Sequence, residues 1–383
     1  MRKLVSIQKI SNVTPIFNAD LIEVVTINGW KIVVKKDDNF KIGDNVVYFE
    51  IDSALPLMDE RFSFLHQETK KIDGIDYHVL KTKKMRGQVS QGLVLPLNKF
   101  PEFNDYKNVK IDENSEVGLG ELIGVIKYEE ETPENLKEIA VGMFPSHTKS
   151  TSIERVQNIS FYDFKKMILN FNDNNPKFTA TLKLNGYSST YFFKNGEWGG
   201  CSRNIQFDLT KVDKKNIYID TFKKIIEPKF QNKELPNFNF AIQGEIIGEK
   251  VMKNFEKIIG NDLYVFKIFN IDKYEILSRK ETKEFCEKYN LNYINEIELE
   301  KDNFKDIVGT SDYDEVLKIV LSNSEMNFVE EQKVNLAINK IQEYFLENAN
   351  GNSMNHQKRE GIVIYFENGD VYKAISNKHL LKN

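Results

Sequence analysis

Lys183 is the residue of this chain whose neighbours most suggest covalent chemistry. It begins the run Lys183-Leu184-Asn185-Gly186, directly after the apolar stretch 178–182, which is typical of a strand. A lysine amine attacks phosphorus only when it is neutral, and the ordinary pKa of lysine is about 10.4. Such chemistry therefore needs desolvation or nearby positive charge, a metal ion included. A glycine three residues later lets the backbone approach a bound nucleotide closely. Because a lysine at a strand end is usually a solvated charge, this spacing alone decides nothing.

Five further blocks follow Lys183 in the chain and offer the other groups of a phosphoryl-transfer site. They are Cys201-Ser202-Arg203-Asn204, Gln243-Gly244-Glu245, Tyr264-Val265-Phe266, Glu360-Gly361-Ile362-Val363 and Tyr372-Lys373-Ala374-Ile375. Glu245 and Glu360 are suited to a ribose hydroxyl and a hydrated Mg²⁺. Arg203 and Lys373 are suited to phosphate oxygens, the first as a fork and the second as a point charge. Phe266 can stack on a base, with the nearby tyrosine as its competitor.

The first third of the chain, residues 1–127, has the pattern of an all-β domain. Val24-Val25-Thr26-Ile27 and Trp30-Lys31-Ile32-Val33-Val34 flank Asn28-Gly29, a hairpin turn signal. Short strands separated by turns favour a small OB-like β-barrel. A basic cluster in this domain is predicted to contact nucleic acid, and it consists of Lys81, Lys83, Lys84 and Arg86. The acidic stretch that ends at Pro133 predicts a linker over residues 128–145.

Residues 146–383 mix strand and helix patterns. Strands are predicted at 178–182, 238–248 and 262–271, and a closing hairpin near the C-terminus. Apolar spacing predicts helices over 217–227, 280–289, 314–322 and 332–348. Pro228 is expected to end the first of them. The predicted class is α+β, an OB-like barrel followed by a domain of antiparallel sheets and flanking helices.

The bulk properties agree with this division. A chain of 383 residues is comfortable for two domains. The net charge of −4 argues against a globally basic nucleic-acid coat but allows a local basic groove. Only Cys201 and Cys286 occur, which favours the cytoplasm or another reducing compartment and no disulfide framework. No segment predicts a membrane span, no spacing predicts zinc, and a monomer is expected.

Taken together, the blocks resemble the ATP-dependent RNA ligases of the covalent nucleotidyltransferase superfamily. The resemblance is to the nick-sealing type with an N-terminal OB domain (Deinococcus/Naegleria type), whose second domain is an adenylyltransferase, an ATP-grasp-like nucleotidyltransferase. It covers nearly the whole chain and includes residues 84–93 and 152–158. It implies an AMP-carrying Lys183 and joining of a 3′-hydroxyl to a 5′-phosphate of RNA. The residues implied at the ATP site are Leu182, Lys183, Gly186, Arg203, Glu245, Phe266, Glu360, Lys373 and Arg155. Mg²⁺ or Mn²⁺ is implied at Glu360 and, through water, at Asn185.

Three positions depart from the family pattern. Asn185 stands where an aspartate is common, so weaker metal binding or a slower reaction is expected because an amide brings no charge. Ile375 stands where many ligases have a second lysine, and Lys267 where an acid is common.

Other functions stay open on the sequence alone. One is another enzyme of the superfamily, a DNA ligase or a capping guanylyltransferase, although these commonly carry an OB domain after the last motif. Another is an end-binding protein with a decayed site. The sequence also leaves open whether the substrate is a duplex nick, a tRNA break or a single-stranded end.

Overall fold

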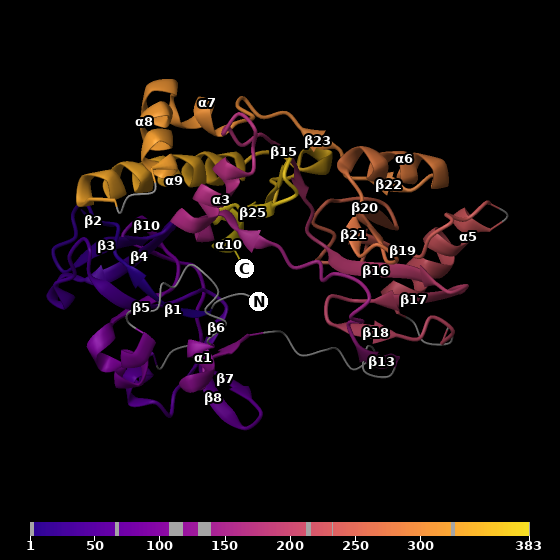
Figure 1. Ribbon diagram of the computed structural model, residues 1–383. Coiled ribbons are helices and arrows are strands. Elements are labelled where there is room, and N and C mark those ends of the chain that lie inside the picture. Colours follow the sequence, from indigo (N-terminus) through magenta and orange to yellow (C-terminus); the bar gives the residue numbers. More distant parts are fainter. Residues whose placement is uncertain are drawn as a thin grey trace.

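The computed structural model describes residues 4–65, 69–106, 118–128, 139–211, 216–231, 233–322 and 326–382. Residues 129–138, the middle of the predicted linker, lie outside these ranges. Figure 1 shows the N-terminal domain at lower left, a sheet covered by a long helix above it, and a second, larger sheet at right.

The N-terminal domain is built from short antiparallel strands. Alternation explains the local structure: in β4 the side chains of Trp30, Ile32 and Val34 are buried and those between them are more exposed. One three-stranded sheet has β5 (Asn45–Phe49) between β1 (Val5–Lys9) and β11 (Leu93–Pro96). The other strands are β2 (Asn12–Pro15), β3 (Ile22–Ile27), β4 (Trp30–Lys35), β6 (Ser53–Pro56), β7 (Thr69–Ile72), β8 (Ile75–Val79), β9 (Lys83–Met85), β10 (Gln88–Ser90) and β12 (Ile126–Lys127), with the short helix α1 (Leu119–Leu122).

The larger sheet of the second domain has the strand order β13-β18-β17-β16-β19-β20-β21, with β22 parallel beside β20. The bounds are β13 (Ala140–Met143), β16 (Tyr187–Lys194), β17 (Glu197–Cys201), β18 (Ile205–Phe207), β19 (Phe240–Gly248), β20 (Asn261–Asn270), β21 (Glu275–Ile276) and β22 (Asn292–Tyr293). Because β13 pairs with β18, residues 140–143 of the predicted linker belong to this sheet. Aromatic and aliphatic side chains pack between the sheet and the helices α4 (Ile217–Thr221), α5 (Glu227–Phe230) and α6 (Arg279–Tyr289).

Pro228 does not end the first predicted helix. A π-helical segment, Phe222–Ile226, connects α4 to α5, and Pro228 lies in the first turn of α5. The change of hydrogen-bond pattern in the π-helical segment coincides with the missing N–H of Pro228, so the helix continues past it. The prediction that the helix stops at this proline is therefore wrong.

The smaller sheet has the order β14-β25-β24-β15-β23 and packs its apolar face against helices. Its strands are β14 (Glu154–Arg155), β15 (Phe178–Lys183), β23 (Glu296–Ile297), β24 (Gly361–Phe366) and β25 (Val371–Ile375). The helices are α3 (Phe161–Leu169), α7 (Phe304–Val308), α8 (Thr310–Leu321), α9 (Phe328–Asn348) and the short α10 (Asn377–Leu380). Among the described helices, none is both long and apolar enough to cross a membrane.

Asn158 joins the N-terminal domain to the smaller sheet. The Trp30 indole N–H donates to Asn158 Oδ1 at 2.6 Å. The Asn158 amide nitrogen donates in turn to Glu50 Oε1 at 2.8 Å and Glu154 Oε1 at 2.9 Å. Glu50 is almost fully buried, so these hydrogen bonds satisfy a carboxylate away from water. The two domains therefore share a polar, buried junction.

Candidate active site

Lys183 and Glu360 meet at the ends of two paired strands. Lys183 is the last residue of β15 and lies opposite Gly361, the first residue of β24. The Lys183 Nζ is 2.6 Å from Glu360 Oε1, and both side chains are largely buried. A Cβ on Gly361 would lie 2.1 Å from the carbonyl oxygen of Ala374, so only glycine lets β25 approach this closely. The Glu-Gly pair read from the sequence thus places an acid directly beside the lysine.

Glu245 reaches the same place from the larger sheet. A Cβ on Gly186 would lie 2.2 Å from the Ile246 carbonyl oxygen, so this glycine brings the turn after Lys183 against β19. Burial raises the pKa of Glu245 to about 7, opposed by the positive charges of Lys183 and Arg203, while the Glu360 carboxylate raises it further. The predicted lysine, arginine and two carboxylates therefore form one electrostatic unit.

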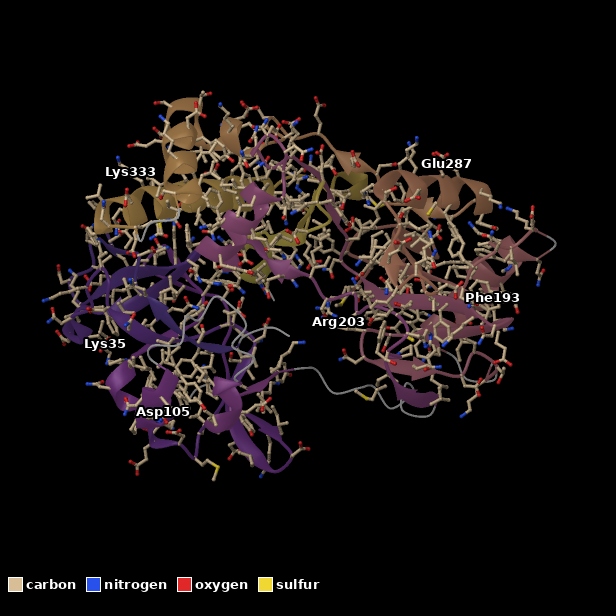
Figure 2. The ribbon with its side chains drawn as sticks, in the orientation of Figure 1. Lys35, Asp105, Phe193, Arg203, Glu287 and Lys333 are labelled. Carbon is tan, nitrogen blue, oxygen red and sulfur yellow. The ribbon has the colours of Figure 1, made fainter. Side chains whose placement is uncertain are left out.

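Arg203 and Lys373 approach this unit from two sides. Arg203 follows β17 and is exposed, and Figure 2 shows it at the edge of the larger sheet that faces the rest of the molecule. Lys373 lies in β25, opposite Val363 of β24, and is partly buried. Lys373 lies on the strand next to β24, and the charge of Arg203 acts on Glu245, an arrangement that suits the binding of phosphate oxygens.

A β-bulge in β20 sets the orientation of the Phe266 side chain. In the register of β19 and β20, Gln243 pairs with Lys267 and the next residue pairs with Val265, so Phe266 is the extra residue. Phe266 packs partly buried in an apolar cluster with Leu182 and Tyr264, close to the nucleophile turn. This half-open apolar surface suits a stacked base. Lys267 is buried, and burial, with Lys149 nearby, lowers its pKa to about 8.

Arg155 faces the N-terminal domain. Its side chain is almost fully buried, with Nη2 3.6 Å from Asp52 Oδ2 and the guanidinium 5.6 Å from the Trp30 ring centre. In the parallel pair β14–β25, Arg155 lies beside Lys373. Arg155 is thus connected to the predicted site by the backbone of β25, the strand that carries Lys373. Its contact with the ATP phosphates stays a prediction.

The basic cluster of the N-terminal domain lies on the β9–β10 hairpin. The turn has Arg86 at φ 48° and Gly87 at φ 85°, the left-handed values of a tight hairpin turn. Lys81, Lys84 and Arg86 are exposed and Lys83 is partly buried. Within the described residues no hydrogen bond or ion pair connects this hairpin to the Lys183–Glu360 pair. Its role in RNA binding stays a prediction.

Two titratable side chains beside the site carry no motif signal in the sequence. Glu256 is 1% exposed and accepts a 2.6 Å hydrogen bond from the Ser353 hydroxyl. Burial raises the pKa of Glu256, and the negative charge of Glu360 raises it further. A hydrogen bond from the Asn185 backbone N–H acts in the opposite direction. Burial lowers the pKa of His379. The Glu360 carboxylate opposes this shift, and the positive charge of Lys183 adds to it. Both lie in segments that come near Lys183 only through the fold.

The donor set fits a hydrated ion rather than a caged one. Within the described parts of the chain, no group of three His, Cys, Asp or Glu side chains converges as ligands. Mg²⁺ is usually held through one or two carboxylates and substrate phosphates while it keeps several waters. Glu360, with the amide of Asn185 on the neighbouring turn, fits that mode of binding.

Comparison with known proteins agrees with this fold and site. A family model of the RNA ligase matches residues 176–376, more than half of the chain, and a model of an OB-fold domain matches residues 4–97. No curated protein sequence gave a significant match. Among solved structures, Naegleria gruberi RNA ligase with PPi matches with a TM-score of 0.74 and 31% identity, over 100% of this chain and 99% of that one.

Two further Naegleria gruberi structures cover 100% of this chain and 99% of their own. A lysine-to-methionine mutant with AMP and Mn has a TM-score of 0.76 and 31% identity. A lysine-to-alanine mutant with ATP and Mn has a TM-score of 0.75 and 30% identity. The fold and site thus define an OB-fold domain joined to a ligase domain, as the sequence predicted. The chain belongs to the family of ATP-dependent RNA ligases with an N-terminal OB-fold domain.

Proposed function

We propose that this protein joins a 3′-hydroxyl to a 5′-phosphate of RNA through a covalent lysyl-AMP, acting at nicks in duplexes. The observation that carries the proposal is the 2.6 Å contact between Lys183 Nζ and Glu360 Oε1, with Glu245 and Arg203 in electrostatic reach. The Glu360 carboxylate is therefore in direct contact with the amine that has to react. The amine becomes a nucleophile only when the pair is broken and a proton leaves Nζ.

In the first step the Lys183 nitrogen forms a bond to the α-phosphorus of ATP, and the bond from that phosphorus to pyrophosphate breaks. Nζ first loses a proton to water, while the Glu360 carboxylate, whose Oε1 lies 2.6 Å from Nζ, stays ionised. In this proposal Glu245 accepts a hydrogen bond from a ribose hydroxyl, and Phe266 stacks on adenine. A Mg²⁺ or Mn²⁺ held by Glu360, with Asn185 through water, would supply positive charge that favours the neutral amine and the departing pyrophosphate.

Two further phosphoryl transfers complete the reaction. The 5′-phosphate of RNA displaces Lys183 from the AMP phosphorus, and the 3′-hydroxyl then displaces AMP from the activated 5′-phosphate. Arg203 and Lys373 are placed to hold phosphate oxygens in these steps, which depend on position and charge stabilisation. The support for RNA as substrate is the family, and the support for a duplex nick is the resemblance to the nick-sealing type.

Incubation with labelled ATP and Mg²⁺ or Mn²⁺ tests the first step. Wild type is expected to acquire label that survives denaturation, and Lys183→Ala to acquire none, because only a primary amine at that place forms the phosphoramidate. Lys194→Ala, a lysine of the adjoining β16, is the matched control. Label on Lys183→Ala would show that the nucleophile is another residue, and an unlabelled wild type would favour an end-binding protein. A sealing assay on nicked, splinted and single-stranded RNA then identifies the substrate.

A further inference from the structure

A basic loop between β19 and β20 lies next to the proposed site. We call residues 249–260 the lysine loop, because it carries Lys250, Lys253 and Lys257. All three lysines are exposed, and within the described residues none of them forms an ion pair. Ile259, near the end of the loop, is 99% exposed. The loop thus offers positive charge and an apolar tip to solvent.

The loop is anchored to the site at its base. The Asn355 amide donates to the backbone carbonyl oxygens of Glu256 at 3.1 Å and Lys257 at 3.3 Å. The buried Glu256 carboxylate accepts from Ser353, in the segment that leads to Glu360. The preceding ring, Phe255, packs edge-on against His379 at 5.5 Å. These contacts anchor the base of the loop to the segments that flank Glu360 in the chain.

The backbone of the loop is also unusual. Asn254 closes it by donating to the Ile258 carbonyl at 2.8 Å and accepting from the Ile258 N–H at 3.1 Å. Five residues of the loop other than glycine have left-handed backbone conformations, with positive φ. Such conformations cost free energy, and they concentrate at functional sites. The five left-handed residues are Lys250 (φ 66°), Met252 (44°), Lys253 (58°), Asn254 (51°) and Lys257 (52°).

We propose that the lysine loop binds phosphates of the RNA strands that flank the end being joined. The base of the loop is anchored to segments that flank Glu360, so a duplex whose 5′-phosphate reacts at the site is expected to pass close to the loop. Unpaired lysines on an anchored backbone bind phosphate without reading sequence, which suits an enzyme that acts on ends. Ile259 is placed to contact a sugar or base edge. The inference rests on the proposed function, since it takes RNA as the ligand.

The test uses the full chain and a nicked RNA duplex with a 3′-hydroxyl and a 5′-phosphate, in EDTA and without ATP. Fluorescence anisotropy across a salt series gives the dissociation constant and its salt dependence. Each phosphate contact contributes about 0.9 to the slope of log affinity against log salt on a duplex. The triple variant Lys250→Gln, Lys253→Gln, Lys257→Gln is therefore expected to bind at least about tenfold more weakly near 0.1 M salt, with a slope lower by about 2 to 3.

Two other variants with three substitutions each serve as controls. Replacing the same lysines by arginine preserves the charge and is expected to retain binding. Lys280→Gln, Lys283→Gln, Lys288→Gln removes three exposed lysines from α6, on the outer face of the same domain, and is expected to change little. Thermal unfolding checks that each variant is folded.

Binding by the loop triple equal to wild type, or equal weakening by the α6 triple, would overturn the inference. Labelling of wild type by ATP is measured in parallel. If wild type takes no label, the proposed function fails, and the comparison of RNA binding still decides the role of the loop.

Discussion

Replacement of Glu245 by glutamine tests whether the site stores unfavourable electrostatic energy. The pKa of Glu245 is raised from 4.5 to about 7, first by burial and then by the Glu360 carboxylate. Since the folded-state value lies above the unfolded-state value, the folded chain keeps a proton between about pH 4.5 and 7 that the unfolded chain releases. The contribution of Glu245 to stability is therefore greatest below pH 4.5 and falls as the pH rises through 7.

The size of the effect follows from the shift. A change from 4.5 to about 7 is about 2.5 pKa units, and at about 1.36 kcal/mol per unit it amounts to about 3 kcal/mol. Glu245→Gln is therefore expected to be more stable than wild type at pH 8 by up to about 3 kcal/mol, with most of that gain lost at pH 5. Urea unfolding followed by circular dichroism at the two pH values measures the difference.

Glu197→Gln is the matched control, because Glu197 is an exposed carboxylate on the neighbouring β17. It is expected to show no gain that depends on pH. A gap between Glu245→Gln and wild type that is the same at pH 5 and pH 8 would refute the reasoning, since burial of an ionised group would then not be its cause.

The same substitution is expected to weaken ATP binding. A hydrogen bond from a ribose hydroxyl to a carboxylate contributes about 1.5–3 kcal/mol to the free energy of binding. A neutral amide in its place recovers only part of that free energy. The KM for ATP in lysyl-AMP formation is therefore expected to rise several-fold at pH 8. In wild type it is expected to fall as the pH rises from 6 to 8, because Glu245 ionises. A KM that does not change with pH or with the substitution would remove the ribose from the account of Glu245.

Two more predictions concern the metal and the domains. Asn185→Asp is expected to raise adenylylation at low Mg²⁺, because it adds a charge beside Glu360; a metal titration checks this, and unchanged titrations for both Asn185→Asp and Glu360→Gln would contradict it. A folded fragment that starts at Ser146 keeps every block of the ATP site, so it is expected to form lysyl-AMP but to seal nicks poorly; sealing equal to the full chain would contradict a clamping role of the OB-fold domain.

The strands were predictable because their patterns are local. The alternation of buried residues in β4 and the apolar run of β15 each follow from a few consecutive residues. That Lys183 and Glu360 share one site was implied by the resemblance of the ordered motifs to the ligase family, and the two side chains are in contact. The predicted helix end at Pro228 was wrong because a π-helical segment before the proline lets the helix continue, and no local sequence pattern marks such a segment.

Glu256 shows what the sequence could not supply. Its partner Ser353 is 97 residues away, and neither residue belongs to a motif or a regular element with a recognisable period. Contacts of this kind depend on how a loop of one sheet packs against a segment leading to the other. The sequence therefore indicated the candidate reacting groups of the site, but not the residues that hold them in place.

The junction between the domains bears on how RNA binding and the chemistry are related. Trp30 of the OB-fold domain packs near the guanidinium of Arg155 and donates to Asn158. Arg155 pairs through the backbone with Lys373, which lies two residues from the end of β25. Lys373, for which we propose binding of phosphate oxygens, is thus separated from the OB-fold domain by a single strand. The proposed clamp and the proposed nucleotide site are therefore connected through β14 and β25.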